Sequence, residues 1–323
     1  MKKICLLTVG ILLIFLSSCN LKEISIKAVC DYYSNLNSYQ TTANMNMYKE
    51  NELVSFNVKA SYLAPNYYRV EFSNASNNNE QIIIKNDEGV FVLTPILNKQ
   101  FKFESDWPLN SSHAYLLSSI IKDIVNDETA TLANDDTEIS IKCKVTHKVN
   151  QKLTYMKFNV SVEDYHPISC CFYDATDAKQ VEVLFNDFKE NPNIAKDYFN
   201  ADKIMDEKTT LLGEGSVENV SGSLDVSYLK ENDDDIKVEI YEDRMVATYN
   251  EYVSYVVVCQ KIAVQELDTP LRIYDDLEMT ELGVVCITNN SINYFYKDQF
   301  ITIYSSDLSV NEFLDVANTI KFA

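Results

Sequence analysis

Apolar and polar side chains alternate strictly along Ser55-Phe56-Asn57-Val58-Lys59-Ala60-Ser61-Tyr62. This period of two puts every second side chain on the same face, which predicts a β-strand with one buried and one wet face. The same alternation returns in residues 139–145 and 156–162, where every second residue is apolar. The three segments together predict an antiparallel sheet.

A hairpin and one helix are expected between these strands. The apolar runs 81–85 and 90–93 flank the turn Asn86-Asp87-Glu88-Gly89, a pattern typical of a β-hairpin. Residues 112–125 predict a helix with an apolar stripe, which consists of Leu116, Leu117, Ile120, Ile121 and Ile124. A stripe this wide is expected to lie on a hydrophobic surface.

The rest of the chain divides into two parts. A helix is expected over Leu21–Leu36, a strand over Val181–Phe188, and a helix-like stretch after it towards Met205. Residues 206–222 are polar and hold three of the six glycines, so we expect a linker there. The predicted organisation is a signal segment 1–18, a first domain 19–205, the linker 206–222 and a smaller α+β domain 223–323.

The second domain is expected to begin with strands and to end with a helix. The predicted strands are Ile236–Tyr241, Met245–Tyr249, Tyr252–Cys259, Val284–Ile287, Ile292–Tyr296 and Phe300–Tyr304. Ser309-Val310-Asn311-Glu312 has the spacing of a capping box, in which each side chain satisfies a free backbone donor of the other residue. Phe313, Val316, Ala317 and Ile320 are expected to face a core.

Composition supports a mainly β protein and limits its partners. The 323 residues include 21 Tyr and 15 Phe but 6 Gly, and the formal net charge is -20. Loss of Lys2 and Lys3 with a signal segment would make it -22. The electrostatic field of a chain with this negative charge repels nucleic acid and anionic headgroups. Attachment to a membrane therefore requires a covalent or hydrophobic anchor.

The N-terminus has the pattern of an exported, lipid-modified protein. Lys2-Lys3 precede an apolar stretch from Ile4 to Leu16, which is shorter than the ~20 residues of a membrane-spanning helix. Leu16-Ser17-Ser18-Cys19 is similar to the bacterial lipobox, which implies cleavage after Ser18 and a diacylglyceryl group on Cys19. The alternative is an uncleaved N-terminal helix. The expected location is the outer face of the cell membrane.

Several segments together resemble a known family. Ala64-Pro65-Asn66-Tyr67-Tyr68-Arg69-Val70-Glu71-Phe72, the hairpin after it, Phe101-Lys102-Phe103 and the helix from Ser112 resemble the LolA/LolB-like lipoprotein localisation fold. The segments 86–95 and 103–112 look more like the sporulation and germination lipoproteins of spore-forming Gram-positive bacteria. This resemblance covers Leu21–Phe199, and residues 293–320 are similar to an uncharacterised domain that often follows.

The resemblance implies a curved, incomplete antiparallel β-barrel with a helical lid over an apolar cavity. Candidate lining residues are Phe56, Val58, Tyr62, Tyr68, Val70, Phe72, Leu116, Leu117, Ile120 and Ile121. The alternative is that these side chains fill a core. In carrier members a basic residue before the Pro-Asn pair latches the lid, whereas this chain has Ala64, and soluble carriers lack an anchor such as Cys19. A fixed receptor or scaffold is therefore expected rather than a shuttle.

The residues offer little support for catalysis or a metal site. Surface roles are expected for His113 and His147, and His166 is too far along its strand from Cys170-Cys171 for direct contact. The six other cysteines lack zinc spacing; they are Cys30, Cys143, Cys170, Cys171, Cys259 and Cys286. Buried thiols are expected, and disulfides joining Cys143 to Cys170 or Cys171, or Cys259 to Cys286, are the alternative.

Other ligand-binding patterns are weak, so binding of a protein is the leading functional hypothesis. The acidic run 231–235 lacks the spaced ligands of a calcium loop and predicts a solvated turn. No phosphate loop, nucleophile elbow or zinc-protease helix occurs, so neither a metal nor a cofactor beyond the lipid on Cys19 is expected. The hypotheses in order are an envelope protein partner, an acyl-chain ligand, and an enzyme of cell-wall or lipid metabolism.

Overall fold

The computed structural model describes most of the chain. The described residues are 24–49, 52–74, 80–95, 99–103, 106–147, 152–212, 223–261, 276–296 and 299–322. The predicted signal segment, Ser18 and Cys19 lie outside them. Among the described helices, none combines the length and the apolar character that crossing a membrane would require.

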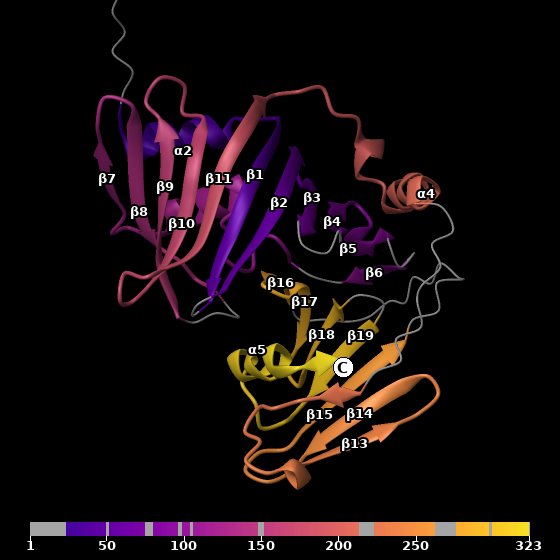
Figure 1. Cartoon of the computed structure of the whole chain (residues 1–323). Helices are drawn as coiled ribbons and strands as arrows, with labels where there is room; N and C mark the ends of the chain where they lie inside the picture. Colours follow the sequence, from indigo (N-terminus) through magenta and orange to yellow (C-terminus); the bar gives the residue numbers. More distant parts are fainter. Residues whose placement is uncertain are drawn as a thin grey trace, which may run out of the picture.

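The first sheet contains eleven antiparallel strands and is open. Their spatial order is β6-β5-β4-β3-β2-β1-β11-β10-β9-β8-β7. Their bounds are β1 (Ser38–Lys49), β2 (Glu52–Leu63), β3 (Tyr67–Asn74), β4 (Glu80–Asn86), β5 (Gly89–Thr94), β6 (Lys99–Phe103), β7 (Thr131–Asn134), β8 (Glu138–Lys144), β9 (Leu153–Ser161), β10 (Pro167–Asp174) and β11 (Lys179–Glu190). Because β11 returns to pair with β1, the two series of hairpins join in the middle of one curved sheet (Figure 1).

The alternating segments form strands as predicted. Phe56, Val58 and Ala60 of β2 point to the buried inner face, while the polar residues between them stay on the outer face. The predicted hairpin is β4 and β5, with Asn86 opposite Gly89. The mainly antiparallel β architecture expected from the sequence is confirmed.

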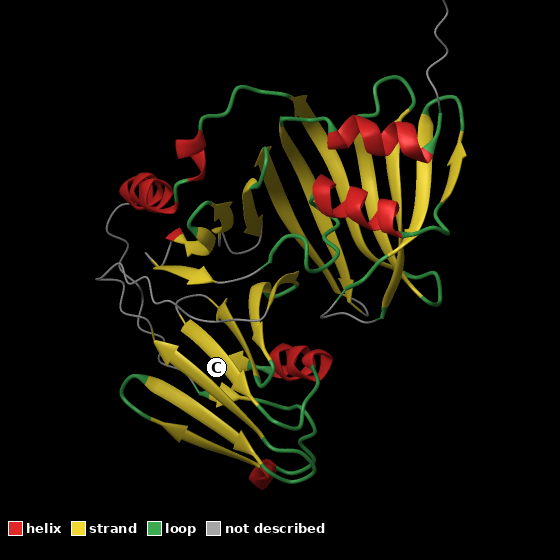
Figure 2. Cartoon of the chain, turned by 180° about the vertical axis from the view of Figure 1, so that it is seen from behind, coloured by secondary structure: helices red, strands yellow, loops and turns green. Residues whose placement is uncertain are grey.

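Two helices lie side by side on the inner face of this sheet (Figure 2). They are α2 (Ile26–Ser34) and α3 (Leu117–Asn126). The Ser25 hydroxyl caps α2 by accepting a hydrogen bond from the Ala28 amide at 3.1 Å. Because Val29 and Tyr33 are buried, α2 packs onto the sheet by the face that carries these two residues.

The helix expected from Ser112 begins five residues later, at Leu117. Ser112 and Thr146 are joined by three hydrogen bonds between 2.8 and 3.1 Å, which hold this segment against the end of β8. The His113 amide donates to the Ser119 hydroxyl at 2.9 Å. These contacts satisfy the backbone without a helix, so the prediction for residues 112–116 was wrong.

The outer face of β3 to β5 is covered by η2 (Lys196–Phe199) and α4 (Ala201–Leu212). Phe199, Ile204 and Met205 form a small core with the isoleucines and aromatic residues of β3 to β5. Helix α4 therefore continues into the segment 206–222 that was expected to be a linker. Residues 213–222 lie outside the described part, and the predicted domain boundaries stay a prediction.

The second sheet contains seven antiparallel strands in the order β13-β14-β15-β19-β18-β17-β16. They are β13 (Ile236–Ile240), β14 (Arg244–Tyr249), β15 (Tyr255–Lys261), β16 (Asp276–Thr280), β17 (Gly283–Thr288), β18 (Ser291–Tyr296) and β19 (Gln299–Tyr304). The short strands β12 (Leu224–Asp225) and β20 (Lys321–Phe322) pair with each other. No strand was predicted at the position of β16.

Helix α5 (Val310–Thr319) completes the second core. The capping box is confirmed, because the Ser309 hydroxyl accepts from the Glu312 amide while the Glu312 carboxylate accepts from the Ser309 amide at 2.7 Å. Phe313, Val316 and Ala317 are buried as expected. This last helix thus packs on β18 and β19, and the short strand β20 follows it.

Candidate functional site

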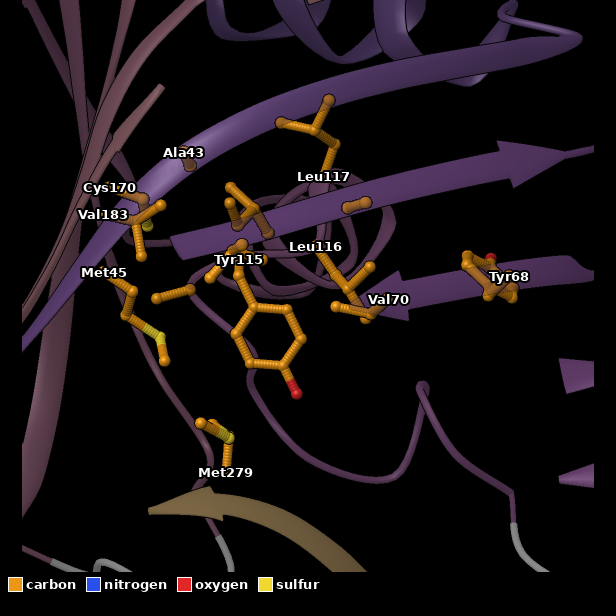
Figure 3. Packing of buried hydrophobic residues seen from close by; sticks show 14 of the residues in the cluster. Ala43, Met45, Tyr68, Val70, Tyr115, Leu116, Leu117, Cys170, Val183 and Met279 are labelled. Atoms are coloured by element: carbon orange, nitrogen blue, oxygen red, sulfur yellow. The ribbon is translucent and has the colours of Figure 1, made fainter. Parts of the chain in front are cut away.

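The ten candidate lining residues lie together between the first sheet and its lid. Nine of them are buried, and Tyr62 packs partly buried against the same cluster. Figure 3 shows Leu116 of the lid segment close to Val70 of β3, with Tyr68 farther along the same strand. The space between sheet and lid is thus occupied by packed side chains, and the role of these residues in ligand binding stays a prediction.

The second sheet closes the mouth of the curved sheet. Leu277 and Met279 of β16 belong to the same hydrophobic cluster as the lid, and Met279 lies near Met45 and Tyr115 in Figure 3. Phe101 of β6 packs against Phe295 and Phe300, with ring centroids 5.2 and 5.7 Å apart. The two sheets therefore share one core.

A glycine allows the second sheet to approach the first this closely. Gly283 has φ +97°, and a Cβ on it would collide with the side chain of Gln81 in β4. The side-chain oxygen Oε1 of Gln81 accepts a hydrogen bond from the Val284 backbone amide at 2.8 Å. A residue with a side chain would be strained in this backbone conformation, so Gly283 suits both the turn and the contact.

Three ionisable side chains meet in this interface. Glu278 projects from β16, and its Oε2 lies 3.3 Å from His147 Nε2 and 3.6 Å from His113 Nδ1. The side chains of Glu278 and His113 are each 1% exposed, and that of His147 is 11% exposed. The expected surface roles of the two histidines were therefore wrong, because that expectation took no account of a partner strand.

Burial keeps both imidazoles neutral at neutral pH. It lowers the pKa of His113 to about 3, helped by the neighbouring His147 and Lys122, and that of His147 to about 4. Burial together with the Glu278 charge raises the pKa of Tyr115, whose hydroxyl lies 3.4 Å from His113 Nδ1. Imidazoles with such a low pKa are weak general bases at pH 7, so the cluster suits a structural contact better than catalysis.

A small cavity adjoins this cluster. Its volume is about 50 Å³, and its walls include Met45, Tyr115, His147, Glu278 and Leu314. Sites for small organic ligands are typically about 300–1,000 Å³. This cavity has room for water and not for an acyl chain, and none of the ten candidate lining residues borders it.

A larger and more polar hollow lies on the outer face, beneath η2 and α4. Its volume is about 300 Å³. On its floor, the Arg69 guanidinium lies 4.4 Å from the Tyr198 ring centroid and forms an ion pair with Glu71 at 2.9 Å. The guanidinium is thus already bound by side chains of the protein, and no pattern in the sequence predicted this hollow.

The remaining candidates for chemistry lie apart from each other. His166 contacts Asp164 at 3.1 Å and Glu190 at 3.4 Å, while the buried Cys170 thiol faces Met156, so the thiol and imidazole do not pair. All six described cysteines are buried and none of them forms a disulfide, so the alternative disulfides are not formed. Burial raises the pKa of Cys143 to about 12, which makes this thiol unreactive.

The acidic run forms a turn, as predicted. The Asp235 carboxylate accepts hydrogen bonds from the backbone amides of Asn232 and Glu231 at 2.7 and 2.8 Å. These bonds hold the pKa of Asp235 below its usual value. Within the described ranges, no group of three acidic, histidine or cysteine side chains is arranged to hold a metal ion.

The fold and this interface define a class of protein: an open, curved antiparallel sheet closed at its mouth by a second sheet and covered inside by helices. The chain belongs to the family of YdcC-like sporulation proteins, whose model matches residues 1–199. It is 27% identical to the sporulation protein YdcC of Bacillus subtilis strain 168 over 331 aligned positions, which cover 99% of this chain and 97% of the relative.

The chain is also similar to several solved structures. One is the LolA superfamily protein from Nitrosomonas europaea, with 10% identity, a TM-score of 0.32, and coverage of 56% of this chain and 100% of that one. Another is the Pseudomonas aeruginosa protein MucB in its complex with MucA, with 11% identity, a TM-score of 0.33, and coverage of 91% and 98%.

Proposed function

We propose that this chain is an extracytoplasmic, lipid-anchored protein of sporulating cells that acts by binding another protein. Membership of the YdcC-like sporulation family supports the cellular context, and Leu16-Ser17-Ser18-Cys19 supports the anchor. Two or more acyl chains on Cys19 would hold it stably, where one would be marginal. Its partner is an envelope protein, and its own body performs no reaction.

The observation that carries this proposal is the filled interior of the first sheet. Side chains of β2, β3 and the lid occupy the space where a carrier would hold an acyl chain. Leu277 and Met279 of β16 occupy the mouth, and the adjoining cavity of about 50 Å³ is too small for a lipid. A protein whose interior is full acts through its outer surface.

The buried ionisable groups also favour binding over catalysis. Glu278 is enclosed between His113 and His147, and both imidazoles are neutral at neutral pH because burial lowers their pKa values. A catalytic base needs a pKa near the working pH and access to substrate. The cluster instead fixes the second sheet against the first.

The test is affinity capture of the full tagged chain from membranes of sporulating cells. We expect one envelope protein to be enriched in a fixed ratio to the chain. Cys19→Ala is the matched control, because it removes the lipid and leaves the folded body unchanged; it should release the chain from membranes and abolish labelling by radioactive palmitate. Recovery of no specific protein would refute the proposed function.

Titration with a fatty-acyl probe distinguishes the proposed protein-binding function from a lipid carrier. The purified chain, stripped of non-covalent lipid, is titrated with a fluorescent 16-carbon fatty acid. We expect no saturable uptake, because the interior is filled. Stoichiometric uptake that is blocked by Ile120→Trp on the lid would favour an acyl-chain carrier instead.

A further inference from the structure

The second sheet has two edge strands, and the structure covers one of them. β16 is buried along its whole length against the first sheet, whereas no strand of the described chain pairs with the outer edge of β13. Figure 1 shows β13 at the end of the molecule farthest from the first sheet. An uncovered edge presents free backbone donors and acceptors to other chains.

The register of β13 shows which backbone groups are free. The Tyr241 amide donates to the Arg244 carbonyl at 2.8 Å. Tyr241 and every second residue before it, Glu239 and Lys237, therefore direct their backbone groups to β14. In an antiparallel ladder the alternate residues turn their N–H and C=O groups to the opposite side. Ile236, Val238 and Ile240 therefore direct their backbone groups to the free edge.

The same three residues carry an apolar strip that becomes more exposed along the strand. Ile236 is 9% exposed, Val238 39% and Ile240 68%. Their cross-strand neighbours Tyr249, Ala247 and Met245 are buried, so the strip continues the core face of the sheet. Helix α5 packs on β18 and β19, and β12 packs on β14, which leaves the end of β13 uncovered.

The usual protections of an edge strand are weak at β13. It contains no proline, and its charged residues Lys237 and Glu239 lie on the opposite face from the strip. In the first sheet, β7 has four residues, and none of them is an exposed large apolar side chain. The other edge strand, β6, is covered where Phe101 packs against Phe295. Of the described edge strands, β13 thus combines free backbone groups with exposed apolar side chains.

Charge indicates the chemistry of the occupant. Between residues 229 and 252 there are eight Asp or Glu and three Lys or Arg residues, a net charge of -5. Glu231 and Asp235 stand before the strand, and Glu242 and Asp243 follow it. Pairing of two copies would bring two such segments together, which like-charge repulsion disfavours. A basic segment is attracted to the same edge.

We propose that the free edge of β13 docks an extended segment of a protein partner, which adds a strand to the second sheet. That segment has apolar residues at alternate positions, to cover Val238 and Ile240, and Lys or Arg at its ends, to pair with the acidic flanks. Main-chain hydrogen bonds supply affinity in this mode, and alternate side chains supply specificity. The inference rests on the proposed function and names the surface and the kind of partner.

The direct test uses the peptide Lys-Lys-Val-Thr-Val-Thr-Val-Lys-Lys and the full chain in neutral detergent. We expect saturable binding by fluorescence polarisation, together with slowed hydrogen exchange at the amides of Val238 and Ile240. Replacing the terminal lysines with glutamates should weaken binding about ten-fold or more, because the flanks then repel. Equal affinity for both peptides, or protection elsewhere, overturns the proposal.

Variants of the chain distinguish strand pairing at the edge of β13 from non-specific binding of the peptide. Val238→Pro removes an outward N–H that the sheet itself does not use, which edge strands tolerate, and should abolish peptide binding. Leu53→Asp is the matched control, since Leu53 is 57% exposed on a strand of the other sheet, and it should bind normally. Thermal unfolding confirms that both variants fold. A concentration-dependent dimer that protects the same amides would assign the edge to a second copy and overturn the proposal.

Capture from cells distinguishes this inference from the proposed function. If the wild-type chain recovers a partner and Val238→Pro loses it, both stand. If Val238→Pro recovers the partner equally well, the edge proposal fails and the proposed function is kept. If the wild-type chain recovers no specific partner, the proposed function fails.

Discussion

β13 and β16 are the two edges of one sheet, and each has five residues, yet their surroundings are opposite. The buried edge is the polar one: Asp276, Glu278 and Thr280 are each at most 4% exposed. The exposed edge is the apolar one, where Ile240 is 68% exposed. Composition alone would place them the other way round.

Contacts within the chain explain why the polar edge strand is buried and the apolar one is exposed. Glu278 meets two imidazoles, the Asp276 carboxylate accepts from the Asn110 side chain, and the Thr280 hydroxyl donates to the Gly283 carbonyl at 3.1 Å. A buried polar group without a partner is costly, so the contacts of Glu278 and Asp276 with His113, His147 and Asn110 favour the observed alignment of the two sheets. β13 has no such neighbour in the described chain, and its apolar side chains remain available.

The largest difference between the two edge strands in the free energy of unfolding is expected when one apolar side chain in each strand is shortened. Leu277→Ala should lower the free energy of unfolding by about 3 kcal/mol, because Leu277 is fully buried in the shared core and a cavity would remain. Val238→Ala should change it by less than about 0.5 kcal/mol, since the side chain is partly in water. Denaturation with urea measures both. Equal losses would mean that β13 is covered in solution.

The next largest difference in the free energy of unfolding is expected when one carboxylate is removed from each edge strand. Glu278→Ala should cost about 2 kcal/mol, because it leaves buried imidazole groups without their acceptor. Glu239→Ala, on the exposed strand, should cost a few tenths of a kcal/mol. Glu278→Gln keeps an acceptor oxygen and should fall between them. A neutral effect of Glu278→Ala would refute the structural role of the cluster.

The pH dependence tests the same cluster through its histidines. Burial lowers the pKa of His113 to about 3 and that of His147 to about 4, while an unfolded histidine titrates near about 6.5. Between about pH 4.5 and 6 the unfolded chain therefore binds two protons that the folded chain does not, and stability falls as the pH falls. Burial raises the pKa of Asp123 to about 6. At this carboxyl group the folded chain therefore binds one proton that the unfolded chain does not, which offsets one of the two histidine protons.

The net expectation is a slope of about 1.4 kcal/mol per pH unit, measured by urea denaturation across that window. In the double variant His113→Gln with His147→Gln, Asp123 alone remains among these three groups. The slope should then change sign, so that stability rises as the pH falls. An unchanged slope in the double variant would show that other groups control it.

The smallest effect on stability is expected at the tip of the exposed edge. Ile240→Asp should change the free energy of unfolding by no more than about 0.5 kcal/mol, because the side chain is already largely in water. Its effect should instead fall on binding of the lysine-flanked peptide, which loses an apolar contact. Calorimetry of the variant gives both numbers. A large loss of stability would place Ile240 in a core.

Local elements could be predicted from the sequence where their signals lie within a few residues of each other. Period-two alternation around Val58 predicts β2, Asn86-Asp87-Glu88-Gly89 predicts the hairpin turn, and Ser309 with Glu312 predicts the start of α5; the structure confirms all three. Family resemblance was also readable, because the segments that carry it are contiguous. These features depend on neighbours along the chain.

The segment that lies at the mouth of the first sheet could not be predicted in this way, because long-range contacts place it there. Asp276-Leu277-Glu278-Met279-Thr280 reads as a polar surface segment, and its burial depends on His113 and His147, more than 130 residues away in sequence. Residues 112–116 leave the helical state because Ser112 bonds to Thr146. Burial is a property of which surfaces meet, and long-range packing sets that, so the filled interior and the open edge of β13 could not be derived from periodicity.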